Sequence, residues 1–253
     1  MLALRFLIAA AVVLLPMACS SSTQQHDTDA GGDTVRVLPE GLSVMALRGG
    51  NGVLEVIALT LRNGPSSTEL YAALKNKGEV PACDAALSVE LFNKREESIA
   101  AGIGALFTQH FYRLTDGSET IAACAGPGDV TMAAVTDLPS DIEIDDVGTI
   151  VYRCPYFALD VIPIDGLTID QMKSVARSAG SAYTGTLVNG LDVTVSNASV
   201  TVFPVNRVGR PLGAATGSGS DEIPPGGSWA FETNSVDVPA VDFAAYPAGA
   251  FAN

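Results

Sequence analysis

The chain contains one pattern twice, and this internal repeat constrains its fold more than any other feature. Residues 74–104, LKNKGEVPACDAALSVELFNKREESIAAGIG, align without a gap on residues 187–217, LVNGLDVTVSNASVTVFPVNRVGRPLGAATG. Farther along, AGPGDVTMAAV at residues 125–135 echoes IPPGGSWAFET at residues 223–233, after a loop that is longer in the first copy. Self-similarity at this length indicates two copies of one domain, because a solenoid unit would repeat every few tens of residues.

The gapless alignment preserves residues with a clear structural meaning. The identical pairs include Asn76 and Asn189, Val89 and Val202, Asn93 and Asn206, Ala101 and Ala214, and Gly104 and Gly217. An Asn with Gly nearby favours a turn, because its side chain can bond to its own backbone. We therefore expect a strand to end at Asn76 and another to end at Asn189.

Between the turns, each copy has short runs of β-branched and apolar residues that predict strands. The runs in the first copy are residues 70–75, 86–92 and 98–107 and a segment with Val130, Met132 and Ala134. Those in the second copy are residues 183–188, 198–205 and 211–217 and a segment with Trp229 and Phe231. A final strand follows in each copy. This spacing predicts an all-β protein of two tandem antiparallel β-sandwich domains, at residues 35–157 and 158–253.

The join between the domains is expected near PIDG at residues 163–166. Just after it, TIDQMKSVAR at residues 168–177 places Ile169, Met172 and Ala176 at helical spacing. Because that spacing puts the three side chains on one face, it predicts a short helix at the start of the second domain.

The residues around these turns also carry a family resemblance. VELFN at residues 89–93, followed by PGD at residues 127–129 before an apolar strand, looks like the FxLYD domain, an immunoglobulin-like sandwich common in bacterial surface lipoproteins. VFPVN at residues 202–206 and the proline–glycine turn of the second copy resemble it too. The motif departs from the family pattern in having Val first and Asn for Asp in both copies, and Pro204 for Leu. The resemblance implies an immunoglobulin-like fold and little about activity, because a fold does not carry a function.

The beginning of the chain has the layout of a secretory signal. Arg5 precedes an uninterrupted apolar run at residues 6–18, which is shorter than the roughly 20 apolar residues of a membrane-spanning helix. The sequence SSSTQQHDTDAGGD after Cys19 is small and polar and cannot bury enough apolar surface to fold. We therefore predict a signal peptide at residues 1–18 and a flexible tether at residues 19–34.

Small residues followed by Cys19 and a Ser-rich stretch resemble the bacterial lipoprotein signal. The resemblance implies cleavage before Cys19, a lipid on its sulfur, and attachment to a membrane of the bacterial cell envelope, facing the periplasm or the cell surface. Lipoprotein signals usually have Leu three residues before the cysteine. This chain has Pro16 at that position, and Leu15 lies one residue further from Cys19. The alternative is an ordinary signal peptide cut nearby, which leaves Cys19 as a free thiol. We favour the lipid because an exposed unpaired cysteine is a liability in an oxidising compartment.

The charge of the chain excludes some partners. Its formal net charge is −14, with 14 Lys and Arg against 28 Asp and Glu. Nucleic acid is therefore not expected as a partner, because phosphate binding depends on clustered basic residues. Attraction to an anionic lipid surface is disfavoured for the same reason. Any attachment to a membrane must come from the lipid on Cys19.

The three remaining cysteines all lie in the first predicted domain. The loops that carry Cys83 and Cys124 emerge at the same end of the predicted sandwich, so we predict a disulfide between them. Such a bond stabilises the fold by roughly 3–4 kcal/mol in the chain-entropy model. Pairing of Cys154 with either one stays an alternative. The second copy has Ser196 where the first has Cys83, and zinc is not expected because the spacing is wrong and no histidine stands beside these cysteines.

No reaction centre is evident in the sequence. Of the two histidines, His26 lies in the tether, and His110 in LFTQHFYRL has the pattern of a half-exposed strand, which favours a surface histidine over a catalytic one. There is no phosphate-binding glycine loop and no G-x-S-x-G motif, and GSGS at residues 217–220 indicates a flexible loop. We therefore expect no catalytic residues, no cofactor and no enzyme activity.

Two acidic clusters and one aromatic group are the candidate ligand sites of the sequence. Asp27, Asp29 and Asp33 have a spacing reminiscent of calcium loops but lack the later bidentate Glu. Asp141 and Glu143 alternate with isoleucines, which predicts a solvated strand face. No metal is expected at either cluster. Three aromatic residues of the long first-copy loop, Phe107, Phe111 and Tyr112, would form a binding platform if exposed, although core packing is the simpler expectation.

Together these features predict a non-catalytic, lipid-anchored envelope protein whose two sandwiches interact with another envelope protein. The alternative is a binding module for a small ligand, a carbohydrate or calcium, at the end of the sandwich that carries Cys83 and Cys124.

Overall fold

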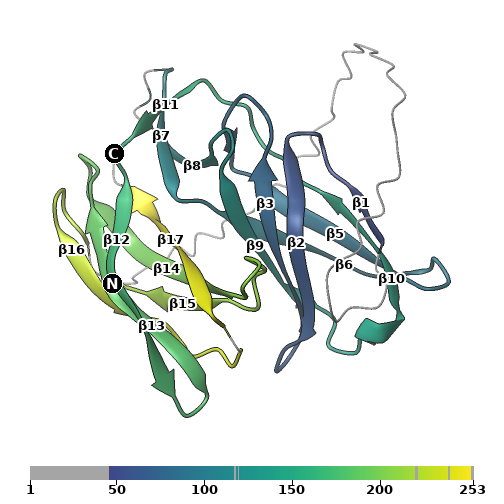
Figure 1. Cartoon of the computed structure of the whole chain (residues 1–253). Helices are drawn as coiled ribbons and strands as arrows, with labels where there is room; N and C mark the ends of the chain where they lie inside the picture. Colours follow the sequence, from purple (N-terminus) through teal and green to yellow (C-terminus); the bar gives the residue numbers. More distant parts are fainter. Residues whose placement is uncertain (1–45, 117, 119, 220–221, 239, 252–253) are drawn as a thin grey trace, which may run out of the picture. The chain divides into compact units, whose positions relative to one another are not determined.

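The computed structural model describes residues 46–116, 118, 120–219, 222–238 and 240–251, which all fall in one compact unit of the chain (Figure 1). The regular elements of these residues are strands and one 3-10 helix, η1 (Ile144–Asp146). The predicted all-β class is therefore confirmed. Neither Cys19 nor the acids of the tether belong to the described residues, so the signal, tether and lipid predictions lie outside them.

The first copy of the repeat forms a seven-stranded sheet. Its strands lie in the order β1 (Ala46–Gly49), β10 (Val147–Arg153), β5 (Ala86–Asn93), β6 (Ser98–Phe107), β9 (Val130–Leu138), β3 (Thr68–Asn76) and β2 (Leu54–Asn63). β1 and β10 are parallel, and the other neighbours are antiparallel. β6 pairs with β5 up to Ala105 and then with β9 through Leu106 and Phe107, so it connects the two halves of the sheet. The halves enclose one apolar core, with Leu74 from β3 and Leu91 from β5.

The second copy repeats this strand order in two three-stranded sheets. One contains β12 (Leu167–Arg177), β13 (Gly180–Asn189) and β16 (Ser228–Glu232), and the other contains β15 (Ala215–Ser218), β14 (Val195–Val205) and β17 (Asp242–Phe251). The order β12-β13-β16 corresponds to β2-β3-β9, and β15-β14-β17 corresponds to β6-β5-β10. The two copies thus share one topology, as the repeated sequence predicts.

The aligned glycines Gly104 and Gly217 show why the repeat keeps a residue without a side chain. A Cβ atom at Gly104 would collide with the carbonyl oxygen of Ala134 in β9. A Cβ atom at Gly217 would lie 2.7 Å from the carbonyl oxygen of Glu232 in β16. In each copy the strand therefore passes too close to a neighbouring backbone for any residue other than glycine.

The longer loop of the first copy contains a hairpin that forms the two central strands of an additional four-stranded sheet. The sheet contains β11 (Val161–Ile164), β7 (His110–Leu114), β8 (Ile121–Ala125) and β4 (Ala82–Cys83), in that order. β11 lies beyond the predicted boundary at residues 157 and 158 but pairs with β7. The two-domain division stays a prediction.

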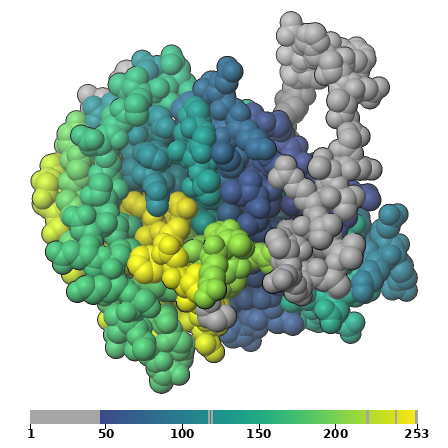
Figure 2. All heavy atoms as spheres, in the orientation of Figure 1, coloured from purple at the N-terminus to yellow at the C-terminus, as the bar shows by residue number. Residues whose placement is uncertain are grey.

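Two apolar clusters join the copies. The first, which we call the junction cluster, contains Tyr71, Ala73 and Met132 of the first copy and Phe203, Val205 and Tyr246 of the second. In the second cluster, Phe111 and Ile121 of the β7–β8 hairpin belong to the core of the second copy. In the space-filling view, the yellow atoms of β17 lie against teal atoms of the first copy (Figure 2).

The short helix predicted at residues 168–177 was wrong, because this segment is strand β12. It pairs with β13 on both sides of a register shift between Asp170 and Lys173, where Gln171 has φ 56°. The less exposed residues of the strand are Leu167, Ile169, Met172 and Val175. The bulge inserts one extra residue, so the less exposed side chains Ile169 and Met172 lie three residues apart instead of two. Three residues is also a spacing typical of one face of a helix, which explains the wrong prediction.

The strand predicted around DIEIDD was also wrong. Asp141 and Glu143 are exposed and Ile142 is buried, as the alternation implies, but the segment leads into η1. The amide of Asp146 donates to the carbonyl of Glu143 and closes this turn. Alternating burial alone therefore does not require a strand.

Candidate functional site

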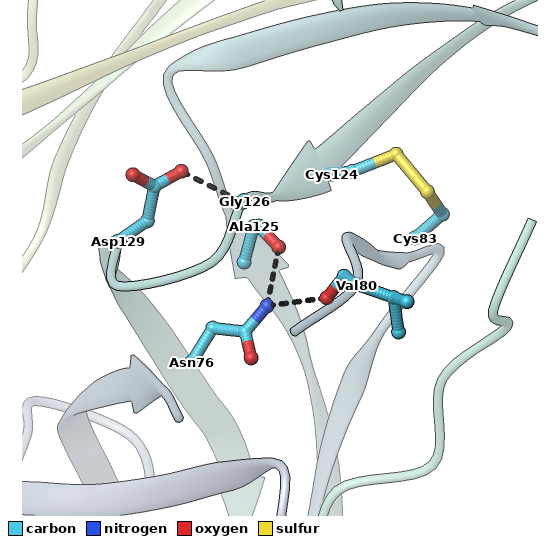
Figure 3. The surroundings of a disulfide bond; sticks show 7 residues. All are labelled: Asn76, Val80, Cys83, Cys124, Ala125, Gly126 and Asp129. Carbon is cyan, nitrogen blue, oxygen red and sulfur yellow. Dashed lines mark hydrogen bonds between the residues drawn. A yellow bond between two sulfur atoms is a disulfide. The ribbon is translucent and has the colours of Figure 1, made fainter. Parts of the chain in front are cut away.

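A disulfide joins Cys83 of β4 to Cys124 of β8, which are partners in register. This is the pairing predicted from the sequence. The alternative pairings of Cys154 with Cys83 or Cys124 are not formed. Cys154 is a free, buried cysteine, and its burial raises the pKa of the thiol to about 12. The disulfide closes the end of the first copy at which polar residues from several strands gather (Figure 3).

The side chain of Asn76 holds this end together. Its Nδ2 donates to the carbonyl oxygens of Val80, at 2.9 Å, and Ala125, at 2.8 Å, as Figure 3 shows. Its backbone amide donates to the carbonyl of Asp129, and its carbonyl accepts from the amide of Gly128. Asn76 therefore ties the β3 terminus to β8 and to the turn that precedes β9.

Asp129 follows that turn and is held in place by it. Its Oδ2 accepts a hydrogen bond of 2.7 Å from the amide of Gly126 (Figure 3). The same oxygen lies 3.5 Å from Nε2 of His110 in β7. The His110 side chain is 58% exposed and that of Asp129 is 27% exposed, so the pair is open to solvent on one side.

A cavity of about 270 Å³ lies beside this pair, and we call it the Asp129 pocket. It is lined by Thr108, Gln109, His110, Ala125, Asp129, Val130 and Thr131. These residues come from the β6–β7 connection, the start of β7, the end of β8 and the start of β9, which meet only in the folded chain.

His110 is on a strand and exposed, as its sequence pattern indicates. The statement that no histidine stands beside the cysteines was wrong in three dimensions, because His110 is the register partner of Cys124. The sequence pattern indicates a strand at His110 but not its pairing with β8, so the proximity of His110 to Cys124 could not be predicted.

The tyrosines near Asp129 have raised pKa values. Burial, and after it the charge of Asp129, raises the pKa of Tyr246 to about 12. The same two causes, in the same order, raise the pKa of Tyr112. Because Tyr246 belongs to β17, the electrostatic environment of Asp129 includes the second copy.

Thr108 differs from the other threonine of the Asp129 pocket. Thr108 is 7% exposed, and its Oγ1 has no hydrogen-bond partner among the described residues. Thr131 is 1% exposed, and its Oγ1 donates to the carbonyl of Phe107. A buried hydroxyl without a partner is unfavourable, so Thr108 is a position at which a bound group could stabilise the protein.

A second hollow, of about 520 Å³, lies where the copies meet. We call it the junction groove. From the first copy it is lined by residues that include Glu69, Tyr71, Ile103 and Asp137, and from the second by Thr201, Ala214 and Thr216. Ile103 is 61% exposed, although it is a large apolar residue. Glu69 accepts from Arg62 at 2.8 Å and from the Tyr71 hydroxyl at 2.9 Å, which fixes the carboxylate at the groove.

The exposed aromatic platform considered from the sequence was wrong. Phe111 is 2% exposed and Tyr112 is 8% exposed, and Phe107 packs against the junction cluster. The simpler expectation, that these rings pack in the protein interior, is confirmed. Two of the rings instead connect the copies, with Phe107 5.2 Å from Phe203 and Phe111 5.8 Å from Phe251 between ring centroids. Tyr112 packs in a cluster with the disulfide cysteines Cys83 and Cys124.

Within the described ranges, no three His, Cys, Asp or Glu residues are grouped so that they could hold a metal ion. This includes the acids of DIEIDD, whereas Asp27, Asp29, Asp33 and His26 lie outside those ranges. The same part of the chain contains no helix long and apolar enough to cross a membrane.

In comparisons with known proteins, no family model matches the chain and no curated protein matches it significantly.

Proposed function

We propose that this protein is a non-catalytic, lipid-anchored component of the bacterial cell envelope that binds another envelope protein through its two β-sandwich copies. The lipid on Cys19 would hold it at the membrane, and the tether would allow the folded part to reach its partner. The resemblance to FxLYD domains of surface lipoproteins is consistent with this role.

The observation that carries the proposal is the junction groove. Both copies line it, so its shape depends on their being packed together through the junction cluster. Ile103 offers an exposed apolar contact, which is a common feature of binding surfaces. The carboxylates that line the groove are Glu69 and Asp137, and no Lys, Arg or His of the described residues lines it. A partner segment with apolar and basic side chains would complement this surface.

The test is site-specific photo-crosslinking in the native cells. A photoreactive amino acid replaces Ile103 in the groove, and a matched variant carries it at Val208, which is 70% exposed and does not line the groove. We expect one envelope protein to be attached through position 103 and not through position 208. Equal labelling at both positions, or no adduct at position 103, would contradict the proposal.

The anchor is tested separately by the intact mass of the mature protein. Cleavage before Cys19 with acyl chains on that residue is the expected result. A chain that begins elsewhere, or a Cys19 without acyl chains, would remove the anchor from the proposal and leave the binding role to be judged by the crosslinks.

A further inference from the structure

We propose that the Asp129 pocket binds a neutral, polyhydroxylated ligand about the size of one sugar ring. This inference does not depend on the protein-binding role, because the pocket and the junction groove share none of their lining residues.

The first support is that the pocket is preorganised. Gly126 fixes the carboxylate of Asp129, Asn76 fixes the backbone of the turn, and the disulfide holds Cys124, which precedes the lining residue Ala125. A site whose polar groups are already held in place loses little conformational entropy when a ligand binds.

The second support is the hydroxyl of Thr108. It is buried, lines the pocket and has no partner within the described part of the protein, whereas the neighbouring Thr131 bonds to backbone. A ligand hydroxyl can both donate to Oγ1 of Thr108 and accept from it. Binding would therefore satisfy a group that the protein's own residues leave without a partner.

The charge and ligand set of the pocket indicate the class of ligand. The carboxylate of Asp129 and the net charge of −14 disfavour an anion. A metal ion is disfavoured because the described residues offer no group of three ligating side chains. Hydroxyl groups fit better, since they donate to a carboxylate and exchange hydrogen bonds with a threonine and an imidazole.

The dimensions of the pocket set the size and affinity. Its volume of about 270 Å³ is just below the roughly 300–1,000 Å³ of sites for drug-sized ligands. No Phe, Tyr or Trp ring of the described residues lines it for stacking. We therefore expect weak binding, with a Kd on the order of 1–10 mM.

The experiment is saturation-transfer difference NMR on the full-length mature protein in detergent, with glucose, galactose, mannose and N-acetylglucosamine as probes. We expect a signal from at least one sugar. Thr108→Val keeps the shape of the side chain but removes the hydroxyl, and it should weaken binding about 5- to 10-fold. Asp129→Asn should weaken it as well.

Thr60→Val is the matched control, because Oγ1 of Thr60 is, like that of Thr108, buried without a hydrogen-bond partner among the described residues, but Thr60 lines neither the Asp129 pocket nor the junction groove. It should leave sugar binding unchanged. The inference is overturned if no sugar gives a signal, or if the Thr108→Val and Thr60→Val variants bind sugar equally well. If calcium chloride changes the protein's spectrum through Asp129 while the sugars do not, the ligand is a cation and the assignment to a neutral ligand is wrong.

Discussion

Asn76 and Asn189, at equivalent positions of the two copies, make the same hydrogen bonds. Nδ2 of Asn189 donates to the carbonyls of Val193 and Ile223, as Nδ2 of Asn76 does to Val80 and Ala125. Each Oδ1 accepts the amide two residues further along the chain. The repeat in the sequence is therefore a repeat of bonding, and the asparagine is the residue on which it depends.

The first prediction concerns these asparagines. Both are 0% exposed, so replacing either by Ala leaves two carbonyls and one amide, each buried or partly buried in its bond to the asparagine, without that partner. We expect Asn76→Ala and Asn189→Ala each to lower the free energy of unfolding by about 2–4 kcal/mol. Denaturant unfolding measures this. The control is Lys75→Ala, because Lys75 is an exposed neighbour of Asn76. It should change the free energy of unfolding by less than about 0.5 kcal/mol. If Lys75→Ala and Asn76→Ala lower this free energy equally, the proposed role of Asn76 is refuted.

The second prediction uses the repeat to move the disulfide into the second copy. Ala82 pairs with Ala125, and the equivalent Val195 pairs with Ile223, so Ser196 and Glu222 take the places of Cys83 and Cys124. Ser196→Cys with Glu222→Cys should form a disulfide and add about 3 kcal/mol in the chain-entropy model. Non-reducing peptide mapping detects it.

The matched control for this disulfide is Val195→Cys with Glu222→Cys, which is one residue out of register because Val195 pairs with Ile223. Because neighbouring side chains on a strand point to opposite faces, this pair should stay reduced. Disulfide formation in both variants would show that the register of β14 does not control the pairing.

The third prediction concerns Cys154. Its pKa is raised to about 12 by burial, so near pH 8 it is almost entirely a thiol rather than a reactive thiolate. Iodoacetamide should leave it unmodified in the native protein and label it in denaturant, as read by mass spectrometry. Native labelling of Cys154 would contradict its burial. Labelling of Cys19 in the same sample would contradict the lipid anchor.

The fourth prediction is a loss of stability at alkaline pH. The pKa of Tyr246 rises from 10.0 to about 12 on folding, mainly through burial. The folded chain keeps its proton longer than the unfolded one, so stability is full below pH 10 and falls as the pH rises toward 12. We expect a loss of about 2 kcal/mol from this residue. Tyr246→Phe should reduce the decline between these pH values, and an unchanged decline would assign it to other groups.

The repeat and its turns were predictable from the sequence because they depend on local chemistry. Asn93 and Asn206 illustrate this, since each Oδ1 accepts two amides of the turn that follows. The partner of Cys83 was also predictable, because the strand order brings the two loops to one end. These features need only the sequence pattern and the order of the strands.

The contacts of His110 and Phe111 were not predictable in the same way. The β7–β8 hairpin places His110 near Asp129 and Phe111 in the core of the second copy, and both contacts depend on tertiary packing. The bulge in β12 likewise depends on pairing with β13. The Asp129 pocket could not be found before these segments were placed in space.

The last prediction tests whether the two copies unfold together. Phe203 is 0% exposed, and its ring contacts Tyr71, Phe107 and Tyr246 in T-shaped arrangements, so it is the centre of the junction cluster. Phe203→Ala should cost about 3–5 kcal/mol and remove most of the coupling between the copies. We expect one calorimetric transition in the native protein and two in the variant.

Phe157→Ala is the control, because Phe157 is 62% exposed. It should leave one transition at nearly the same Tm, since truncating an exposed ring creates no cavity. If Phe203→Ala also unfolds in a single transition at an unchanged Tm, the junction cluster does not couple the copies. The junction groove would then be no fixed surface, because its two walls would move independently, and the proposed binding role would lose its structural basis.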